Sequence, residues 1–597
     1  MKRTKASLRK KSAGKVKVKA AAGKKAAAPK AAAKKAASVD PITIEIVGNG
    51  LRSIADETFI ALMKSAYSTN IKERKDHSTA ICDASGRLIA QAEASLPVHI
   101  ASMTGLMKHL LADYAGKINK GDIFIANDPH VAGGTHLPDI NMAIPVFHED
   151  KLVAFMCNIA HHADVGGMFP GSMAGGMAEI YQEGLRVPVI KLFSKGELND
   201  DILKLILLNV RVPQERRGDY FAQVAACRLG ERRLVELFEA YQTGPMLKIF
   251  DEIVHRTRKR MQAAIERIPD GTYTFEDVMD DDGLGTTNIP VKVHIEVRGS
   301  AIKVDFKGTA RQVKGNINTT LNATQAAVCY TLKSLLDPEI PNNQGMLDAV
   351  ELVAESGTLV SSVFPAPVAA RANTCQRIVD VVVGALASAL PLVAVGAANG
   401  ANTTAVFAGI DPRSGQSYVY LETLGGGFGG RASKDGTDGV QVHITNTSNL
   451  PVEAIETEYP LLVESYSLVE DSGGAGKFRG GMGLRRVIRP IGHDCTFNGA
   501  LERAVNRPWG IFGGGPGAVG RFMLIGPSDE TLLAAKPSGV TVTAGEKLMI
   551  ESPGAGGYGN ASERSAELVE QDRSSGKFSA TFLAQNYPAM VQLPKAS

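Results

Sequence analysis

The sequence predicts a large, mixed α/β protein with several lobes, the second of them rich in glycine and in strands. Three observations support this prediction. The chain has 597 residues, more than one hydrophobic core normally serves. Apolar residues make up 44% of it and charged residues 21%, as in ordinary globular proteins. Helical spacing and strand-like alternation of apolar residues both occur, and glycine clusters are frequent in the second half.

The first lobe is predicted to begin with a helix from Pro41 to about Ala66, because its apolar residues recur at roughly helical spacing. A short hairpin should follow, with strands at Ser78–Cys82 and Leu88–Gln91 joined by an Asp-Ala-Ser-Gly turn. A second helix is predicted from Ile100 to about Tyr114. The chain is therefore expected to enter the core at once through a long helix.

A strand, a polar loop and a second hairpin are predicted next. The strand covers Asp122–Ala126, and the loop covers Asn127–Asp139. The hairpin has strands at Ile140–Phe147 and Leu152–Ala160. His161 is therefore expected at the end of a strand.

Two helical stretches complete the first lobe, at Asp200–Asn209 and at Pro213–Arg267, the second interrupted at a Gly-Pro pair. The pattern then changes to alternation at Thr272–Phe275 and Val291–Phe306. This change places a lobe boundary near residues 268–272.

Four segments follow from these patterns: a basic Lys/Ala-rich tail at 1–38, a lobe with a histidine cluster at 39–270, a glycine-rich mixed α/β lobe at 271–565, and a C-terminal extension at 566–597. Dense glycine typically marks close backbone crossings or positive φ. The second lobe is therefore expected to contain many tight backbone contacts.

The formal net charge of +4 is unevenly distributed. Residues 1–38 hold 14 Lys or Arg and no acid, which leaves 52 basic and 62 acidic residues in the rest of the chain. The tail is predicted to be a disordered arm, because its low-complexity composition cannot build a core. Attraction of this arm to nucleic acid is an alternative, and a basic-tailed nucleic-acid-binding protein is the remote alternative function.

The cellular setting is predicted from what the sequence lacks. No uncharged apolar stretch of about eighteen residues occurs, and the N-terminus has no apolar core of a secretory signal. The six cysteines lie far apart, without a close pair for metal binding or redox exchange. A cytoplasmic protein with reduced cysteines and no membrane association is expected.

Histidines are concentrated in one region. Eight of the 12 lie between residues 77 and 162. An even distribution would place about two there, and histidines with nearby carboxylates are typical of metal or hydrolytic centres. The chemistry is therefore expected in this region.

Four residues of this region form a candidate ligand set. His136 and Asp139 lie three apart on a loop stiffened by Pro138, His161 follows from a strand end, and Asp76 comes from an earlier segment. Imidazole with carboxylate suits Zn, Mn or Fe(II), and the absence of thiolates argues against a closed structural zinc site. One divalent metal is therefore predicted, with a metal-free acid/base site as the alternative.

Four more polar residues are candidates for supporting the ligands: Asp128, His130, His162 and Asp164. The first two equally suit a structural role in a turn. His162 is the rival of His161 as a ligand. Neighbouring side chains on a strand point to opposite faces, so only one of the two should reach the ion.

Two other kinds of site are not supported. Gly425–Gly430 lacks the Gly-Lys-Ser/Thr ending of a phosphate-binding loop, so ATP binding by this chain is not expected. Ser95 and Ser172 lack a Gly-x-Ser-x-Gly elbow, which argues against a serine hydrolase.

Motifs around the ligand candidates resemble those of the hydantoinase B family, which includes the B halves of 5-oxoprolinases and caprolactamase and the α subunits of acetone carboxylases. The resemblance covers roughly residues 40–560 and implies a hydantoinase B-like fold. The motifs that carry it are Gly121–Pro129, Gly133–Asp139, Ala160–Gly167, Gly315–Thr320, Pro365–Pro367, Gly425–Arg431, Asp471–Gly481, Glu502-Arg503 and Ser552–Gly559.

The resemblance implies that Asp76, His136, Asp139 and His161 bind the metal and that the last three are catalytic. It also implies a hetero-oligomer, in which a hydantoinase A-type subunit binds ATP and phosphorylates the carbonyl oxygen of a small cyclic amide, such as a hydantoin, 5-oxoproline or a lactam. This chain would then open the ring. Acetone carboxylase α subunits are typically longer, so an ATP-dependent ketone carboxylase is kept as the alternative.

Overall fold

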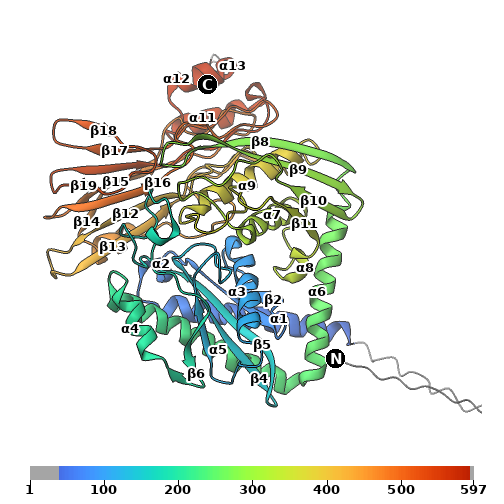
Figure 1. The fold of residues 1–597 in the computed structure, drawn as a ribbon. Helices are drawn as coiled ribbons and strands as arrows, with labels where there is room; N and C mark the ends of the chain where they lie inside the picture. Colours follow the sequence, from blue (N-terminus) through green and yellow to red (C-terminus); the bar gives the residue numbers. More distant parts are fainter. Residues whose placement is uncertain (1–38, 592–597) are drawn as a thin grey trace, which may run out of the picture.

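The computed structural model describes residues 39–591, so the predicted basic arm lies outside the described residues. Helices and four sheets share this range, which confirms the mixed α/β class. In Figure 1 the N-terminal elements form the lower part, the C-terminal strands form the upper part, and α6 (Thr243–Ile265) runs along one side between them.

The lower part is built on one antiparallel sheet with the order β2-β1-β5-β4-β3-β6-β7. Its strands are β1 (His77–Asp83), β2 (Leu88–Gln91), β3 (Ile123–Ala126), β4 (Asp139–His148), β5 (Lys151–His161), β6 (Ile190–Ser194) and β7 (Glu197–Leu198). Both predicted hairpins are confirmed, and His161 ends β5 as expected.

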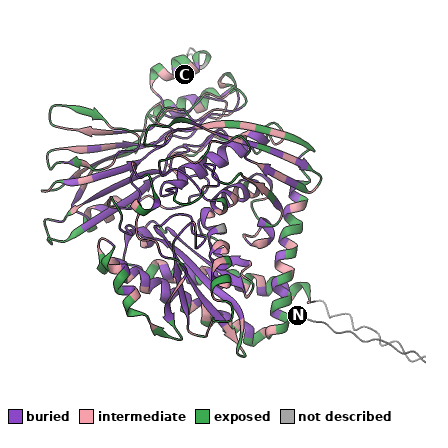
Figure 2. Cartoon of the chain, in the orientation of Figure 1, coloured by how far each residue is buried: buried purple, intermediate pink, exposed green. Residues whose placement is uncertain are grey.

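Helices cover both faces of this sheet. Ile81 of β1 packs in the cluster of α1 (Pro41–Ser65) and α5 (Pro213–Tyr241), whereas its neighbours Ala80 and Cys82 pack with α3 (Ile100–Asp113). Successive side chains of a strand face opposite ways. The strands are therefore buried on both sides, as the purple strands in the lower part of Figure 2 show.

Local signals explain how the helices begin and end. Asp40 caps α1 by accepting a hydrogen bond from the Thr43 backbone N–H at 3.0 Å, and Pro41 occupies the first turn. The predicted interruption between α5 and α6 is confirmed. It lies at Gln242, whose φ is +63°, just before the Gly-Pro pair.

Three further sheets form the upper part, with the orders β11-β10-β9-β8, β13-β12-β16-β19 and β14-β15-β20-β17-β18. Their strands are β8 (Gly271–Asp281), β9 (Thr287–Arg298), β10 (Ala301–Asp305), β11 (Val350–Val353), β12 (Thr403–Ile410), β13 (Ser417–Leu424), β14 (Leu461–Leu468), β15 (Leu484–Pro490), β16 (Cys495–Ala500), β17 (Arg521–Ile525), β18 (Glu530–Leu532), β19 (Val540–Val542) and β20 (Lys547–Glu551).

The predicted alternation at Val291–Phe306 covers two strands. β9 and β10 form an antiparallel hairpin within it. Gly299, with φ +56°, takes the left-handed conformation that this tight turn requires.

Two long helices of the upper part, α7 (Leu321–Leu336) and α9 (Arg371–Leu386), are not among the predicted elements. In α9, 15 of 16 residues are buried, and Figure 2 shows it purple at the centre of the molecule. The shorter helices are α2 (Thr69–Lys72), α4 (Asp200–Leu208), α8 (Gln344–Leu347), α10 (Val452–Glu458), α11 (Ala566–Ser574), α12 (Ala580–Asn586) and α13 (Pro588–Val591).

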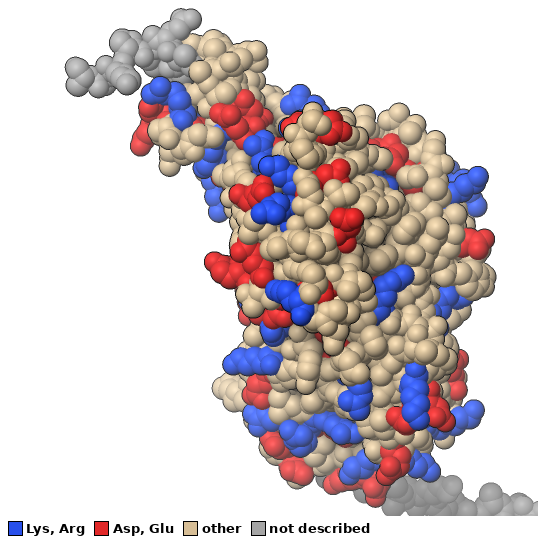
Figure 3. Space-filling model, turned by 90° about the vertical axis from the view of Figure 1, so that its left-hand side faces the viewer, with Lys and Arg blue, Asp and Glu red and all other residues tan. Residues whose placement is uncertain are grey.

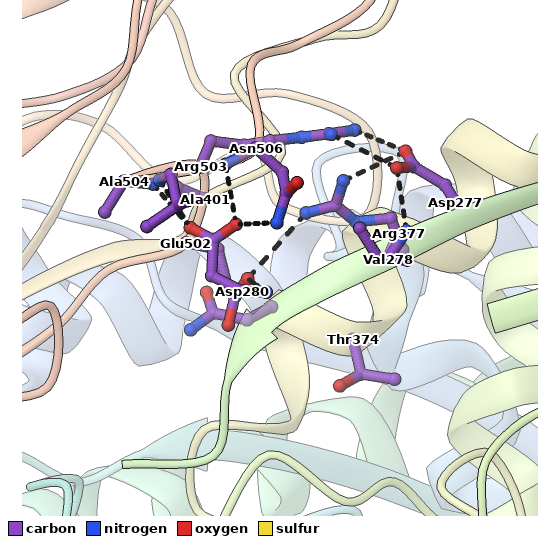
Figure 4. A network of polar contacts seen from close by, with 12 residues as sticks. Asp277, Val278, Asp280, Thr374, Arg377, Ala401, Glu502, Arg503, Ala504 and Asn506 are labelled. Carbon is purple, nitrogen blue, oxygen red and sulfur yellow. Dashed lines mark hydrogen bonds and ion pairs between the residues drawn. The ribbon is translucent and has the colours of Figure 1, made fainter. Parts of the chain in front are cut away.

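A buried ion network holds the middle of α9 (Figure 4). Asp277 of β8 accepts hydrogen bonds from Arg377 at 2.9 Å and from Arg503 at 2.7 Å. Arg503 also bonds Asp380 of α9 at 2.9 Å. Glu502 accepts from the buried Lys536 at 2.8 Å. The Glu502-Arg503 motif therefore joins α9 to the upper strands.

The glycine clusters allow backbones to cross closely. A Cβ on Gly480 would lie 1.8 Å from the Ala555 carbonyl oxygen, and one on Gly429 would lie 1.9 Å from the Gly396 carbonyl oxygen. No side chain fits at these distances. One apolar cluster contains residues from both sides of the expected boundary near 270, including Phe124 and Val382, so the division into lobes stays a prediction.

Surface charge and helix length are the features relevant to binding of nucleic acid and of a membrane. On the face in Figure 3, basic and acidic groups are interspersed and neither sign forms a continuous field. Among residues 39–591, no helix combines the length and apolar character needed to cross a membrane.

Candidate metal centre

Three of the four expected ligands lie together at one end of the lower sheet. Asp139 begins β4 and pairs in register with His161, the last residue of β5, and His136 lies on the loop just before. All three are buried, and their potential ligand atoms lie within 4.8 Å of one another. We call this set the His-Asp-His group.

His136 is oriented by a backbone carbonyl. Its Nδ1 lies 2.9 Å from the Ala369 carbonyl oxygen, which can only accept, so the ring proton is on Nδ1 and Nε2 has a free lone pair. Nε2 lies 3.2 Å from Oδ1 of Asp139, and neither atom has a hydrogen-bond partner among the described residues. Two buried acceptors left unpaired side by side fit a cation.

The other oxygen of Asp139 is fully engaged. Oδ2 accepts hydrogen bonds from Thr135 Oγ1 at 2.9 Å and Arg371 Nη2 at 2.6 Å, and His99 Nε2 lies 3.6 Å away. These donors fix the plane of the carboxylate and leave Oδ1 as its free atom.

His161 is held by Asn70, whose Nδ2 lies 2.9 Å from Nδ1 of the ring. The Asn70 oxygen accepts from Arg74 at 2.6 Å. With Asn70 donating to Nδ1, a neutral ring carries its proton on Nε2. An ion at Nε2 therefore requires the Asn70 carboxamide to turn its oxygen toward the ring.

Asp76 lies on the wall of the same cavity but outside the His-Asp-His group. Its backbone carbonyl accepts from the His161 N–H at 3.0 Å, and its Oδ2 lies 3.6 Å from Arg74 Nη2. Burial raises the pKa of the Asp76 carboxyl, against the attraction of Arg74. Its role as a fourth ligand stays a prediction.

Electrostatics prepare the group for a cation. Burial lowers the pKa of His136, and the Arg371 charge adds to this effect. Burial and then His136 hold the pKa of His161 well below its usual range. For Asp139, burial favours a raised pKa, but His136 and Arg371 outweigh it and hold the pKa well below its usual range. At neutral pH the group therefore has neutral imidazoles and a carboxylate, the state that metal binding needs.

Two of the expected supporting residues organise loops. Asp128 accepts from nearby backbone amides and from Arg186 Nε at 2.5 Å. Asp164 accepts from the backbone amides of its own loop and from the backbone and guanidinium of Arg211. Neither carboxylate lines the cavity.

The two histidines of the supporting set point elsewhere. His162 Nε2 pairs with Gln223 Oε1 at 2.9 Å, its ring stacks on Tyr220, and burial lowers its pKa to about 4. His130 Nε2 bonds the Ala366 carbonyl oxygen and lines a separate groove of about 900 Å³. The structure brings His161, and not His162, to the group.

The cavity beside the group is small, about 20 Å³, which is more than one water molecule needs. Residues from distant parts of the chain complete its wall, and none of them was among the predicted site residues: His99, Arg371, Asn402, Thr423, Thr445 and Thr447. Only His99 carried a signal, as a member of the histidine-rich region. Arg371 follows the Pro365–Pro367 motif, but nothing in the local pattern assigns it to a site.

Comparison with known proteins gives a consistent result. The model of the family described as hydantoinase B/oxoprolinase matches residues 40–561. The chain is 31% identical to caprolactamase subunit beta of Pseudomonas jessenii, over 93% of this chain and 97% of that one. It is 33% identical to 5-oxoprolinase 1 of Arabidopsis thaliana, over 87% of this chain and 42% of that longer protein.

Solved structures agree. The crystal structure of ATP-dependent caprolactamase from Pseudomonas jessenii matches with a TM-score of 0.88 and 28% identity, over 94% of this chain and 98% of that chain. A nucleotide-free acetone carboxylase matches with a TM-score of 0.86 and 19% identity, over 92% and 79% of the two chains. At that identity the second likeness shows the fold alone.

Proposed function

The chain belongs to the hydantoinase B/oxoprolinase family, and from this premise we propose that it is the metal-bearing subunit of an ATP-dependent cyclic amide hydrolase. The observation that carries the proposal is the unpartnered pair His136 Nε2 and Asp139 Oδ1 inside the buried His-Asp-His group. A caprolactamase and a 5-oxoprolinase among the relatives support the substrate class.

The ion would be Zn, Mn or Fe(II), held by His136, Asp139 and His161, with Asp76 as the fourth ligand. When bound, such an ion lowers the pKa of a water molecule and polarises a carbonyl. The residues present fit this group, because His136 Nε2 and Asp139 Oδ1 are buried acceptor atoms with no hydrogen-bond partner among the described residues.

Protein groups around the ligands orient them and receive the substrate. Ala369 fixes the tautomer of His136, while Thr135 and Arg371 hold one oxygen of Asp139. Arg371 Nε has no hydrogen-bond partner among the described residues, and its side chain lines the cavity. A buried guanidinium N–H suits an anionic oxygen, such as that of a phosphorylated amide.

ATP is assigned to a second subunit of the hydantoinase A type. This chain has no recognisable phosphate-binding loop, and a relative that matches nearly its whole length is named as a subunit of a caprolactamase. Phosphorylation of the substrate oxygen by that partner would give the ring carbon a better leaving group.

Activity of the reconstituted pair tests the function. Each subunit alone and the mixture are assayed for phosphate release and ring opening with hydantoins, 5-oxoproline, lactams and ketones. Ring opening by the mixture alone, dependent on ATP, is expected. Ring opening by this chain without ATP would replace the proposal by a self-sufficient metallohydrolase. Strict dependence on bicarbonate would assign the chain to the ketone carboxylases instead.

Metal content tests the ligands. The purified protein should contain about one divalent metal per chain, and His136→Ala or Asp139→Ala should remove it. His130→Ala is the matched control, because this imidazole lies on the separate groove and should leave the metal in place. Full metal in both ligand variants would show that the assignment is wrong.

A further inference from the structure

Asn402 carries a carboxamide without a hydrogen-bond partner on the wall of the metal-site cavity. The residue is 6% exposed, its Oδ1 is fully buried, and its side chain makes no hydrogen bond to any residue of the described range. Buried polar groups are nearly always paired. An unpaired carboxamide in a cavity therefore indicates a ligand.

The backbone of Asn402 is fixed on both sides. Its N–H donates to Asn373 Oδ1 of α9 at 2.9 Å, and its carbonyl accepts from Thr404 Oγ1 at 2.9 Å. It directly precedes β12. The backbone of Asn402 is thus held at a set position, from which the side chain lines the same cavity as His136 and His161.

The three threonine hydroxyls on the same wall have partners already. Thr423 and Thr447 accept from Arg74, and Thr445 bonds the Val442 carbonyl oxygen. The hydroxyls of Thr423 and Thr447 can still donate, but Asn402 differs from the threonines in that neither its donor nor its acceptor is engaged by a described residue.

The chemistry of a carboxamide matches a ring amide. A small ring holds its amide bond in the cis form, so the N–H and the C=O lie on the same edge, whereas open-chain secondary amides are trans and present them on opposite edges. A carboxamide offers a donor and an acceptor side by side and can pair with both groups of a cis amide. A ketone has no donor and leaves the Asn402 oxygen unpaired.

We propose that Asn402 binds the N–C=O edge of the substrate ring and selects cis amides over trans amides and ketones. This inference rests on the proposed function and names the residue that sets its substrate class. The cavity of about 20 Å³ is smaller than a lactam ring, so the ring would enter only after side chains of the wall move. The paired edge would then place the carbonyl carbon beside His136 and His161, which line the same cavity.

Binding to the metal-loaded, full-length chain tests the selection. Calorimetry is run with 2-pyrrolidinone, its N-methyl derivative, N-methylacetamide and cyclopentanone. The wild type should bind 2-pyrrolidinone at least about tenfold more tightly than the other three, equal to about 1.4 kcal/mol. Asn402→Leu, of similar size but without polar atoms, should remove this preference and leave cyclopentanone binding unchanged. An unchanged preference in this variant would overturn the inference.

Two measurements separate the possible failures. Asn402→Asp keeps the shape but not the donor, so it should lose the preference too, and both variants should retain the wild-type metal content if they are folded. If the wild type opens the ring in the reconstituted complex and both variants do so with the same kcat/KM, that result refutes the role of Asn402 but not the proposed function. Absence of ring opening in the wild type on every cyclic amide refutes the function itself.

Discussion

Hydrogen bonds to one atom of the His136 ring and to one oxygen of the Asp139 carboxylate set the orientation of each group. His136 gives one nitrogen to a carbonyl, and Asp139 gives one oxygen to donors from Thr135 and Arg371. These contacts leave His136 Nε2 and Asp139 Oδ1 free, and the two atoms face each other at 3.2 Å. Such supporting contacts typically tune metal affinity as strongly as the ligands' own spacing does.

Glu183 supports the same arrangement from behind. Its Oε1 accepts from the Ala369 N–H at 2.7 Å, and the Ala369 carbonyl accepts from His136. Burial raises the pKa of Glu183 to about 8, although hydrogen bonds from backbone amides oppose the shift. In the folded protein this carboxyl is mostly protonated at neutral pH, whereas in the unfolded chain it is ionised.

This raised pKa predicts a pH-dependent stability. The contribution of Glu183 to the free energy of unfolding is fully present below the ordinary glutamate pKa of 4.5 and is lost as pH rises to about 8. Glu183→Gln does not titrate at this position. Between pH 5 and pH 8 its free energy of unfolding should therefore rise by roughly 3 kcal/mol relative to that of the wild type. Urea unfolding at both pH values measures this. A difference that does not change with pH would mean that Glu183 is ionised in the folded protein.

At the scale of elements, α9 links the metal centre to the upper sheets. Arg371 in its first turn contacts Asp139, while Arg377, labelled in Figure 4, and Asp380 bond the buried ion network through Asp277 and Arg503. These contacts connect α9 to Asp139 at its first turn and to β8 and Arg503 at its middle. The network is therefore expected to matter for stability more than for chemistry.

Breaking the network should be costly. Glu502→Ala removes the nearer and fully buried of the two carboxylates that contact Lys536, at 2.8 Å, and leaves only Asp281 at 3.4 Å. Removing one partner of a buried pair typically costs about 3–5 kcal/mol, and the remaining contact with Asp281 places the expected cost at the lower end. The control is Glu355→Ala, because the Glu355–Arg311 pair is largely exposed and typically contributes at most about 1 kcal/mol. Thermal unfolding of both variants compares them. Equal stabilities would show that the network contributes little.

At the scale of the whole molecule, both parts of the chain build one site. The lower sheet provides the His-Asp-His group, and residues from 371 onward provide Arg371 and Asn402. The caprolactamase match covers 94% of this chain, so the hydantoinase B-like fold extends over nearly the entire chain.

If the proposed site holds a metal, its removal should destabilise the whole protein, because the folded cavity would bind the ion and the unfolded chain does not preform the site. With free metal at about 100 times its Kd, the ion adds about 2.7 kcal/mol to the free energy of unfolding. Chelation should lower the unfolding temperature of the wild type. It should not affect His136→Ala, and an equal response of the two proteins would contradict a metal at this site.

Removal of residues 1–38 should leave turnover nearly unchanged, because the matched family region begins at residue 40. The kcat/KM of the reconstituted complex is the measurement. A loss beyond about tenfold, or about 1.4 kcal/mol of transition-state stabilisation, would assign this segment to the working enzyme.

Several features follow from the sequence alone. Residues with one clear period, such as Pro41–Ser65 and the hairpin that ends at His161, form the expected elements, because local spacing decides which face is apolar. The histidine density and the neighbouring motifs also indicate the region of the chemistry and the family.

Other features were decided only by the tertiary structure. In α9, 15 of 16 residues are buried, so no polar face marks it as a helix in the sequence. Arg371 and Asn402 reach the cavity from more than 200 residues beyond His136, and nothing in their local sequence records this contact. The choice of His161 over His162 follows from the contacts of the folded chain: His161, the last residue of β5, joins the group, whereas His162 bonds Gln223 of α5.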